Sequence, residues 1–451
     1  MFIIILIILI ILVLVKLRYN NSGDVYSDYI YLDNNATTRA APGSVEIYAK
    51  TRNVGNPNSF YNEKLLKNEE AVKSRVISVL FGPDLINENY VCIINSGATE
   101  GNCNVYDSFI RSRGHVIISN CEHYNSIAYI KKQEKYTILE YPYTPESINS
   151  ALIANTGKKL LSIMAINNET GEDFRYLFNN ITTPGDDVYT HSDVTQLFGK
   201  AHMKPRVDFA TGSFHKIGGP AGIGFIVCSP RGYKILSEYP LFPGKSDAVR
   251  AGTINYSALM LSDNAMLKYR YALMYILSLR NTIINELNSS GIPVINSVPF
   301  NMQENSPASA IIPANTPPGK FYIINITPET QLTESNTNFS GSIPGTLLIS
   351  VIRSGDPITN TKDNKPCHFC NVVLRKYLYN HGVIVSIGSA CSGKTPSHVL
   401  QAMKLPFLVR CGILRISLAQ FNTILDVRTF VRLMIAGIHE QSPETAGRTV
   451  S

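Results

Sequence analysis

Short runs of apolar residues alternate with longer amphipathic segments through most of the chain. The longer segments, such as residues 63–80 and 257–289, carry apolar side chains at helical spacing and predict helices. Short apolar runs bounded by turn residues predict buried strands, and these runs are residues 90–95, 115–119, 160–166, 188–191 and 224–228. The alternation predicts an α/β fold in which helices cover both faces of a sheet.

The two ends of this pattern are less regular. Residues 30–33 predict a short strand that leads into the polar pair Asn34 and Asn35. Residues 297–345 and 354–366 are rich in Pro, Asn, Ser and Thr, which predicts loops or a surface insertion. A length of 451 residues is enough for two domains, and we expect the helical stretch at 257–289 to lead into the second.

The first residues form a segment of their own. Residues 2–15 are all apolar and are followed by Lys16 and Arg18. As a helix this run would span about 21 Å of a ~30 Å hydrocarbon core, and a snorkelling Lys16 closes part of the gap. The basic residues that follow favour a cytosolic position for the rest of the chain. We expect residues 1–19 to anchor the protein in a membrane. The alternatives are a buried helix and a targeting peptide, whose removal would leave a cytoplasmic or organellar protein.

Composition limits the possible partners. The chain is 44% apolar and 17% charged, which is typical of a globular protein. A net charge of +7 without a dense Lys/Arg run gives no reason to expect a nucleic-acid partner. Eight cysteines scattered among predicted strands and helices indicate a reducing compartment. Cys367 and Cys370 form one C-x-x-C without a second ligand pair, so packing is favoured over metal binding and we expect no metal site.

The strongest chemical signal is Lys216, which lies in a loop rich in Gly and Pro shortly after Asp193 and Gln196. A lysine amine can hold pyridoxal 5'-phosphate (PLP) as a Schiff base, and a carboxylate can keep the pyridine nitrogen protonated. Gln196 could hydrogen-bond the phenolic oxygen of the ring. A lone lysine in such a loop is usually only a surface charge, so the prediction depends on the residues that accompany it.

Further motifs follow other predicted strands. Ala98 and Thr99 open a helix, where amides and a hydroxyl can hold a phosphate, although an ordinary capped helix start would look the same. His123 could stack on a pyridine ring or be a structural histidine, and Asn168 could belong to an ordinary loop. Ligands of open α/β sheets bind beyond the carboxyl ends of the strands. Because all these motifs occupy that position, the set predicts a PLP site.

These motifs resemble those of the NifS/IscS-type cysteine desulfurases, which belong to the class V aminotransferase group of fold-type I PLP enzymes. The similar stretches are YLDNNATT (31–38), GNPNS (55–59), SGATE (96–100), CEH (121–123), NNETG (167–171), SDVTQ (192–196), SFHKIGGPAGIG (213–224), RAGT (250–253) and GSAC (388–391). The resemblance implies a large PLP-binding domain over residues 42–285, with a mostly parallel seven-stranded sheet between helices. It also implies a smaller α+β domain made of residues 20–41 and 286–451.

The resemblance assigns most of the motif residues to the cofactor. Lys216 would carry PLP, Asp193 would bind its pyridine nitrogen, and Gln196 would contact its phenolic oxygen. The residues that would stack on the ring or bind the phosphate are His123, Ala98, Thr99, Ser213 and His215.

Other residues are assigned to the substrate and to a second chain. Asn168 would lie over the cofactor near the substrate, and Arg415 would bind the substrate carboxylate, for which a guanidinium is suited. Thr253 would reach the phosphate held by the neighbouring subunit, which implies a homodimer.

Cys391 supplies the second half of the implied chemistry. It stands between Gly388 and Gly393, so its thiol can move with a flexible loop, and Lys394 can favour the thiolate. With Lys216 and His123 it would convert L-cysteine to L-alanine, holding the sulfur as a persulfide for a sulfur-acceptor or iron–sulfur scaffold protein. A selenocysteine lyase, another class V lyase and an inactive PLP-fold scaffold are the alternatives.

Overall fold

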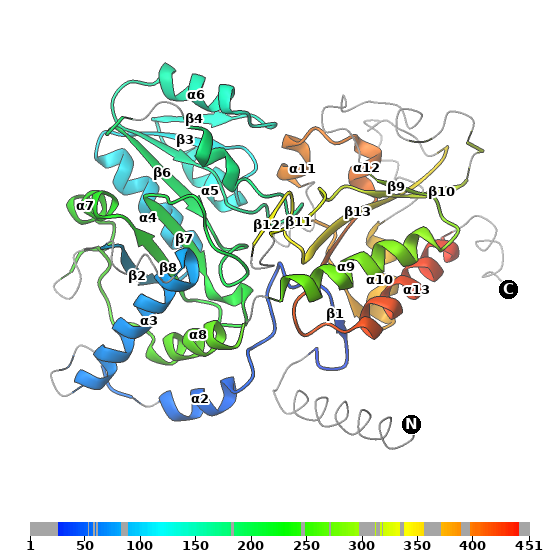
Figure 1. Ribbon diagram of the computed structural model, residues 1–451, viewed down its shortest axis with the longest axis horizontal. Coiled ribbons are helices and arrows are strands. Elements are labelled where there is room, and N and C mark those ends of the chain that lie inside the picture. Colours follow the sequence, from blue (N-terminus) through cyan, green and yellow to red (C-terminus); the bar gives the residue numbers. More distant parts are fainter. Residues whose placement is uncertain are drawn as a thin grey trace.

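The computed structural model describes residues 26–52, 54–56, 59, 62–82, 89–181, 185–244, 249–269, 272–296, 312, 316–317, 319–333, 338–355, 371–388 and 397–441. These residues form a large and a smaller sheet that lie side by side, each with its own helices (Figure 1). Residues 1–19, the Cys367/Cys370 pair and Cys391 lie outside the described residues. Within the described ranges, no helix combines the length and apolar character needed to cross a membrane.

The large sheet has seven strands in the order β2-β8-β7-β6-β5-β3-β4. Its strands are β2 (Val91–Asn95), β3 (His115–Ser119), β4 (Tyr136–Leu139), β5 (Lys159–Ser162), β6 (Val188–Asp193), β7 (Phe209–Ser213) and β8 (Gly224–Cys228). Only β8 runs against its neighbours, so the other six point the same way. The predicted α/β fold with a mostly parallel sheet is confirmed.

Neighbouring residues of these strands face two different hydrophobic cores, as the twofold period of a strand requires. Ile93 and Leu160 belong to one core, whereas Ile94 and Leu161 belong to the other. The first core lies beneath α4 (Ala98–Arg111), α5 (Tyr124–Ile130) and α7 (Pro230–Glu238). The second lies beneath α3 (Glu63–Phe81), α6 (Pro145–Ala154) and α8 (Tyr256–Lys268). Helices therefore cover both faces of the sheet.

The smaller sheet has the order β15-β13-β10-β9. Its strands are β9 (Val294–Asn296), β10 (Phe321–Asn325), β13 (Thr346–Arg353) and β15 (Ile413–Ser417). One face packs against α9 (Leu273–Asn288), α10 (Asn371–Asn380) and α13 (Ile424–Glu440). The other face, near α11 (His398–Ala402) and α12 (Phe407–Cys411), joins the core of the large sheet (Figure 1).

The segment that precedes α2 (Ser44–Thr51) crosses to the smaller sheet. Strand β1 (Ile30–Tyr31) pairs in parallel with β14 (Val383–Ile384), and Asp33 forms a bridge with Ser417 of β15. This pairing brings residues 33–38 into the junction between the two sheets. Arg175 makes a second connection between distant parts of the chain. It pairs with Asp173 at 2.7 Å and donates to the backbone oxygen of Phe339 at 2.7 Å.

Three expectations from the sequence were wrong in detail. The stretch 257–289 is two helices, α8 and α9, because the backbone leaves the helical conformation and becomes extended at the buried residue Tyr269. Residues 297–345 are not simply a loop or surface insertion, because the apolar run of β10 is an inner strand of the smaller sheet. Strand β5 ends at Ser162, four residues earlier than the apolar run 160–166 predicts.

Candidate functional site

A cavity of about 280 Å³ opens where the strands of the large sheet end and the smaller sheet begins. Ten of the twelve predicted site residues line it: Ala98, Thr99, His123, Asn168, Asp193, Gln196, Ser213, His215, Lys216 and Arg415. Thr253 does not line the cavity of its own chain; it is exposed and accepts a hydrogen bond from Asn56 at 3.3 Å. Cys391 lies outside the described residues. The structure thus gathers in one place residues that are far apart in the sequence.

Lys216 follows β7, at the end of a short 3₁₀ turn, η3 (Phe214–Lys216). Its Nζ donates to the backbone oxygens of Asn35 at 2.6 Å and Ala36 at 2.5 Å. Two residues later, Gly218 has φ +88°, and a Cβ there would lie 2.7 Å from the backbone oxygen of Arg39. Only glycine therefore lets the lysine loop pack this closely against the N-terminal segment.

Asp193 is the last residue of β6 and is buried at the base of the cavity. Its Oδ1 accepts from the backbone N–H of Thr195 at 2.9 Å, and its Oδ2 accepts from Nδ2 of Asn102 at 2.9 Å. One hydrogen bond to each oxygen fixes the plane of the carboxylate and leaves acceptor capacity for a ligand.

One end of the cavity is suited to an anion. Helix α4 begins at Ala98, whose backbone N–H donates to Oγ of Ser213 at 2.8 Å, and Thr99 follows on the first turn. Burial and the nearby charge of Lys216 lower the pKa of His215 to about 4, so its imidazole is neutral near pH 7. A helix N-terminus with hydroxyl and imidazole groups is a typical phosphate site.

His123 and Gln196 also line the cavity. His123 is the N-cap of α5, where its Nδ1 accepts from the Asn125 backbone at 3.4 Å, and burial lowers its pKa. The Gln196 amide donates to the backbone oxygen of Asn35 at 3.0 Å and accepts from Nζ of Lys200 at 3.2 Å. Burial and the charge of Lys216 lower the pKa of Lys200 to about 7. Asn35 lies within the YLDNNATT motif, but neither its role nor that of Lys200 was predicted from the sequence.

Arg415, on β15, forms the opposite wall and is only 1% exposed. Its Nη2 pairs with Oδ1 of Asp33 at 2.8 Å, and its Nη1 donates to the backbone oxygen of Asn168 at 3.0 Å. The guanidinium is therefore held in place from both sides, as a site for a ligand carboxylate requires.

The residues that flank Cys391 in the sequence lie beside this wall. Ser397 donates to Oε2 of Glu169 at 2.6 Å, and a Cβ on Gly388 would lie 3.8 Å from the same oxygen. The backbone of Ser386 pairs with that of Arg415 at 2.8 and 3.1 Å. Three residues of chain from Gly388 to Cys391 cover at most about 11 Å. Both attachment points of the cysteine segment are thus next to the cavity.

The side chains present fit PLP. Three buried polar atoms of cavity-lining residues have no hydrogen-bond partner within the described structure: Oδ1 of Asn168, Oγ1 of Thr195 and Nε of Arg415. Buried polar atoms normally have a hydrogen-bond partner, so these three atoms at the cavity wall are available to a bound ligand. The cavity offers an amine for the aldehyde, a carboxylate for the ring nitrogen and an anion site for the phosphate. Within the described ranges, no three His, Cys, Asp or Glu side chains gather as a metal site.

This combination of fold and site defines a PLP-dependent enzyme of fold-type I. A family model described as Aminotransferase class-V matches residues 30–263, and the chain belongs to that family. It is similar to a cysteine desulfurase of Cereibacter sphaeroides, at 24% identity over 90% of the chain and 94% of the relative. It is also similar to cysteine desulfurase IscS of Buchnera aphidicola, at 26% identity over 91% and 93%. A match to a NifS/IcsS homolog of Lactobacillus delbrueckii, at 28% identity, spans 51% of the chain and 63% of that protein.

Solved structures show the same fold. A NifS-like protein from Rickettsia africae superposes with a TM-score of 0.69 at 24% identity, covering 91% of this chain and 99% of the other. The cysteine desulfurase CsdA of Escherichia coli gives a TM-score of 0.60 at 16% identity, over 95% and 98%. The resemblance to NifS/IscS-type enzymes is confirmed by these comparisons.

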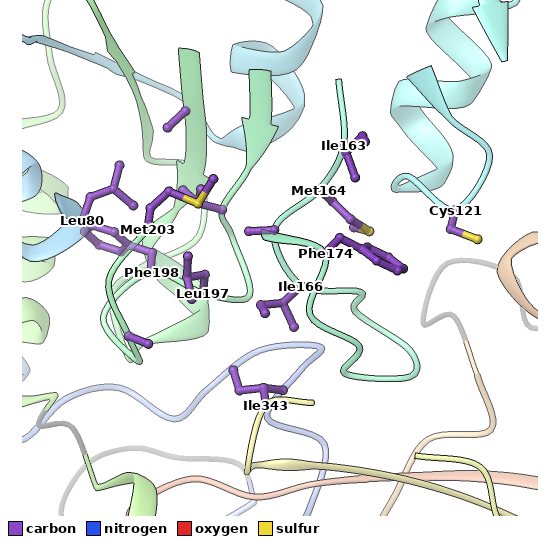
Figure 2. Close-up of a cluster of buried hydrophobic side chains, with 14 of the residues drawn as sticks. Leu80, Cys121, Ile163, Met164, Ile166, Phe174, Leu197, Phe198, Met203 and Ile343 are labelled. Carbon is purple, nitrogen blue, oxygen red and sulfur yellow. The ribbon is translucent and has the colours of Figure 1, made fainter. Parts of the chain in front are cut away.

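Glu122, next to His123, is a buried carboxyl with an unusual environment. Its Oε1 accepts from the Ser119 hydroxyl at 2.5 Å and the Met164 backbone at 2.6 Å, while its Oε2 has no partner among the described residues. Cys121, its neighbour in the chain, and Met164, its backbone partner, belong to the cluster of buried apolar side chains drawn in Figure 2. Burial raises the pKa of Glu122 to about 8, so the carboxyl is mostly protonated at neutral pH.

We predict that Glu122→Gln stabilises the protein increasingly as the pH rises from about 4.5 to about 8. In the unfolded chain the carboxyl ionises near pH 4.5, but in the folded chain it keeps its proton until about pH 8. Wild-type stability therefore falls through this window, by an amount on the order of 5 kcal/mol, and a neutral amide does not share that loss. Urea unfolding at several pH values measures the difference. The exposed Glu134→Gln should show no such trend, and a trend equal to that of Glu122→Gln would contradict the assignment.

Proposed function

We propose that the protein is a PLP-dependent cysteine desulfurase that converts L-cysteine to L-alanine and holds the sulfur on Cys391. The observation that carries this proposal is that the Lys216 amine, the Asp193 carboxylate and the Arg415 guanidinium line a single cavity. The first two match PLP, and the third matches the carboxylate of an amino-acid substrate.

Each residue would act at a defined atom. When bound, PLP supplies an electron sink that makes the substrate α-proton acidic and the bond between Cβ and sulfur labile. The Lys216 amine would move the α-proton of the substrate. Arg415 holds the substrate carboxylate, and Asn168 lies next to it in the cavity. His123, whose pKa is lowered by burial, presents a neutral imidazole that can accept a proton.

Cys391 would take the sulfur. Its thiolate would attack the substrate sulfur, so that a persulfide S–S bond forms as the bond from sulfur to Cβ breaks, and the electron pair left on Cβ takes up a proton. L-alanine then leaves, and the terminal sulfur passes to an acceptor, such as an iron–sulfur scaffold protein or a thiolation enzyme. The positions of Gly388 and Ser397 beside Glu169 support this role, because they attach the cysteine segment at the rim of the cavity.

We predict that Cys391→Ser keeps the yellow colour of the lysine-bound cofactor but releases no sulfide from L-cysteine in the presence of dithiothreitol. The variant retains the PLP site and loses only the sulfur nucleophile. Lys216→Ala should instead lose the absorbance of the lysine-bound cofactor. Sulfide, alanine and the absorption spectrum are measured together. Cys103→Ser, which replaces another free thiol, is the matched control and should behave like the wild type. Full sulfide release by Cys391→Ser would exclude the persulfide role.

We also infer a homodimer in which Thr253 of each subunit contacts the phosphate bound by the other. This inference is supported by the family resemblance and by the position of Thr253, which is exposed and outside the cavity of its own chain.

Thr253→Ala should weaken PLP binding roughly tenfold, because one hydrogen bond to a charged phosphate is lost. Chains with Thr253→Ala and chains with Lys216→Ala should complement each other after mixing. In a mixed dimer, the intact lysine meets an intact threonine from the other chain. Cofactor titration of each variant and of the mixture measures this. If mixing restores no tight site, the threonine does not act across subunits.

We further propose that residues 1–19 anchor the protein in a membrane, with the catalytic body on the cytosolic side. The support is the wholly apolar run at 2–15 and the basic residues Lys16 and Arg18 that follow it.

The full chain should sediment with membranes after cell lysis and should resist extraction by salt and by alkaline carbonate. A chain that begins at Asn20 should be found in the soluble fraction, because it lacks the apolar run. Fractionation with desulfurase activity as the marker compares the two. Identical partition of both chains would rule out the anchor.

A further inference from the structure

Behind Asp193, buried side chains from one helix and three strands form a continuous line of hydrogen bonds. Each of these side chains is at most 6% exposed. In order along the line they are Tyr106, Ser162, His191, Thr211, Asn102 and Asp193. Tyr106 and Asn102 come from α4, and the others come from β5, β6 and β7. The line therefore crosses the sheet and ends on the carboxylate that faces the cavity.

The register of the strands brings these side chains together. His191 and Asp193 are two residues apart on β6, so they point to the same face. Their direct neighbours are Ser162 on β5, opposite His191, and Thr211 on β7, opposite Asp193. Helix α4 reaches this face because residue 101 is glycine: a Cβ there would lie 3.1 Å from Cγ2 of Thr211.

The chemistry of the groups fixes the direction of every hydrogen bond. The Asp193 carboxylate only accepts, so Nδ2 of Asn102 must face it, at 2.9 Å, and Oδ1 of Asn102 must accept from the Thr211 hydroxyl. A hydroxyl has one hydrogen, so Thr211 in turn accepts from Nε2–H of His191, at 3.0 Å. A neutral imidazole then accepts at Nδ1, from the Ser162 hydroxyl at 2.8 Å. Ser162 accepts from the Tyr106 hydroxyl at 2.9 Å.

We propose that this one-way line of donors is a positioning network that holds the Asp193 carboxylate in place and aimed at the pyridine nitrogen. The proposal rests on the proposed function, since it concerns how the same site holds PLP. Each donor in the line polarises the next toward the carboxylate, and chains of this kind strengthen one another in a low-dielectric interior. Thr211 and His191 do not line the cavity, so they act only through Asn102 and Asp193, whereas Asn102 lines the cavity beside Asp193. Burial lowers the pKa of His191 to about 4, which agrees with a neutral ring that donates through Nε2.

The decisive substitution is Thr211→Val, which keeps the shape of the side chain and removes the link between His191 and Asn102. In holoenzyme reconstituted with PLP labelled with ¹⁵N in the ring, the pyridine nitrogen signal should move toward the unprotonated position. The kcat for L-cysteine should fall roughly tenfold with little change in KM. The reason is that Nε2–H of His191 and Oδ1 of Asn102 lose their partner, so Asn102 holds the Asp193 carboxylate less firmly. Thr211→Ser, which keeps the hydroxyl, should restore both the signal and kcat. Equal behaviour of the two variants would overturn the proposal.

A second pair of variants tests the direction of the hydrogen bonds. This pair also replaces the first test if Thr211→Val does not fold. His191→Gln places an amide N–H at the position of Nε2, whereas His191→Asn places it at the position of Nδ1. The glutamine variant should stay close to the wild type in both readouts, and the asparagine variant should resemble Thr211→Val. If the asparagine variant performed as well as the glutamine variant, the assigned direction would be wrong.

The network can also be tested without the cofactor. In apoprotein with ¹⁵N-labelled histidine, His191 should be the Nε2–H tautomer, with the signal assigned by its loss in His191→Gln. The Nδ1–H tautomer would overturn the proposal even in the absence of PLP. A wild-type protein that shows the Nε2–H tautomer but takes up no PLP would instead refute the proposed function and the role of the network in it.

Discussion

The cavity depends on hydrogen bonds that Asn35 makes to both sheets. Its Nδ2 donates to the Thr346 hydroxyl of β13 at 2.9 Å and to the backbone oxygen of Asn168 at 3.3 Å. Its backbone oxygen accepts from Lys216 at 2.6 Å and from Gln196 at 3.0 Å. One residue of the N-terminal segment therefore sets the distance between the lysine wall and the arginine wall. Because it is buried at 5% exposure, any change that left these groups unpaired would be costly to the whole site.

The parallel strands explain why so many functional side chains meet at this junction. Six of the seven strands of the large sheet end at the same edge, and the chain leaves several of them through a residue of the site. The smaller sheet closes the cavity from outside with Arg415 of β15, whose strand also carries the bridge from Asp33 to Ser417. The same backbone pairing thus anchors the N-terminal segment and places the guanidinium. A site of this kind is a property of the junction, and neither sheet contains it alone.

The sequence predicted the parts of the site that are local and left out those that depend on strand register. Asp193 and Ala98 lie just beyond apolar runs that predict strands, so their place at one edge could be inferred. Strand β7, which leads to Lys216, was not predicted, and the role of this lysine was inferred from the residues that accompany it. The role of Arg415 came only from the family resemblance, because its position requires β15 to pair with β13 and with the N-terminal segment. Strand β10 was not predicted, because the sequence on both sides of it is polar and rich in proline. The hydrogen-bond line from Tyr106 could not be predicted, because it depends on the register of β5, β6 and β7, and a different register would bring other side chains together.

Burial makes most ionisable groups around the cavity prefer their neutral form. It raises the pKa of Glu122 and Glu169 and lowers that of His191 and Lys200. Glu100 differs, because its hydrogen bond from Arg250 outweighs the effect of burial and lowers the pKa of the carboxyl. Neutral neighbours do not compete for the charges of a bound ligand. A phosphate, a ring nitrogen and an amino-acid carboxylate would then each be bound by the few groups that point at them. Because these groups are separate, one small cavity can bind both a cofactor and its substrate.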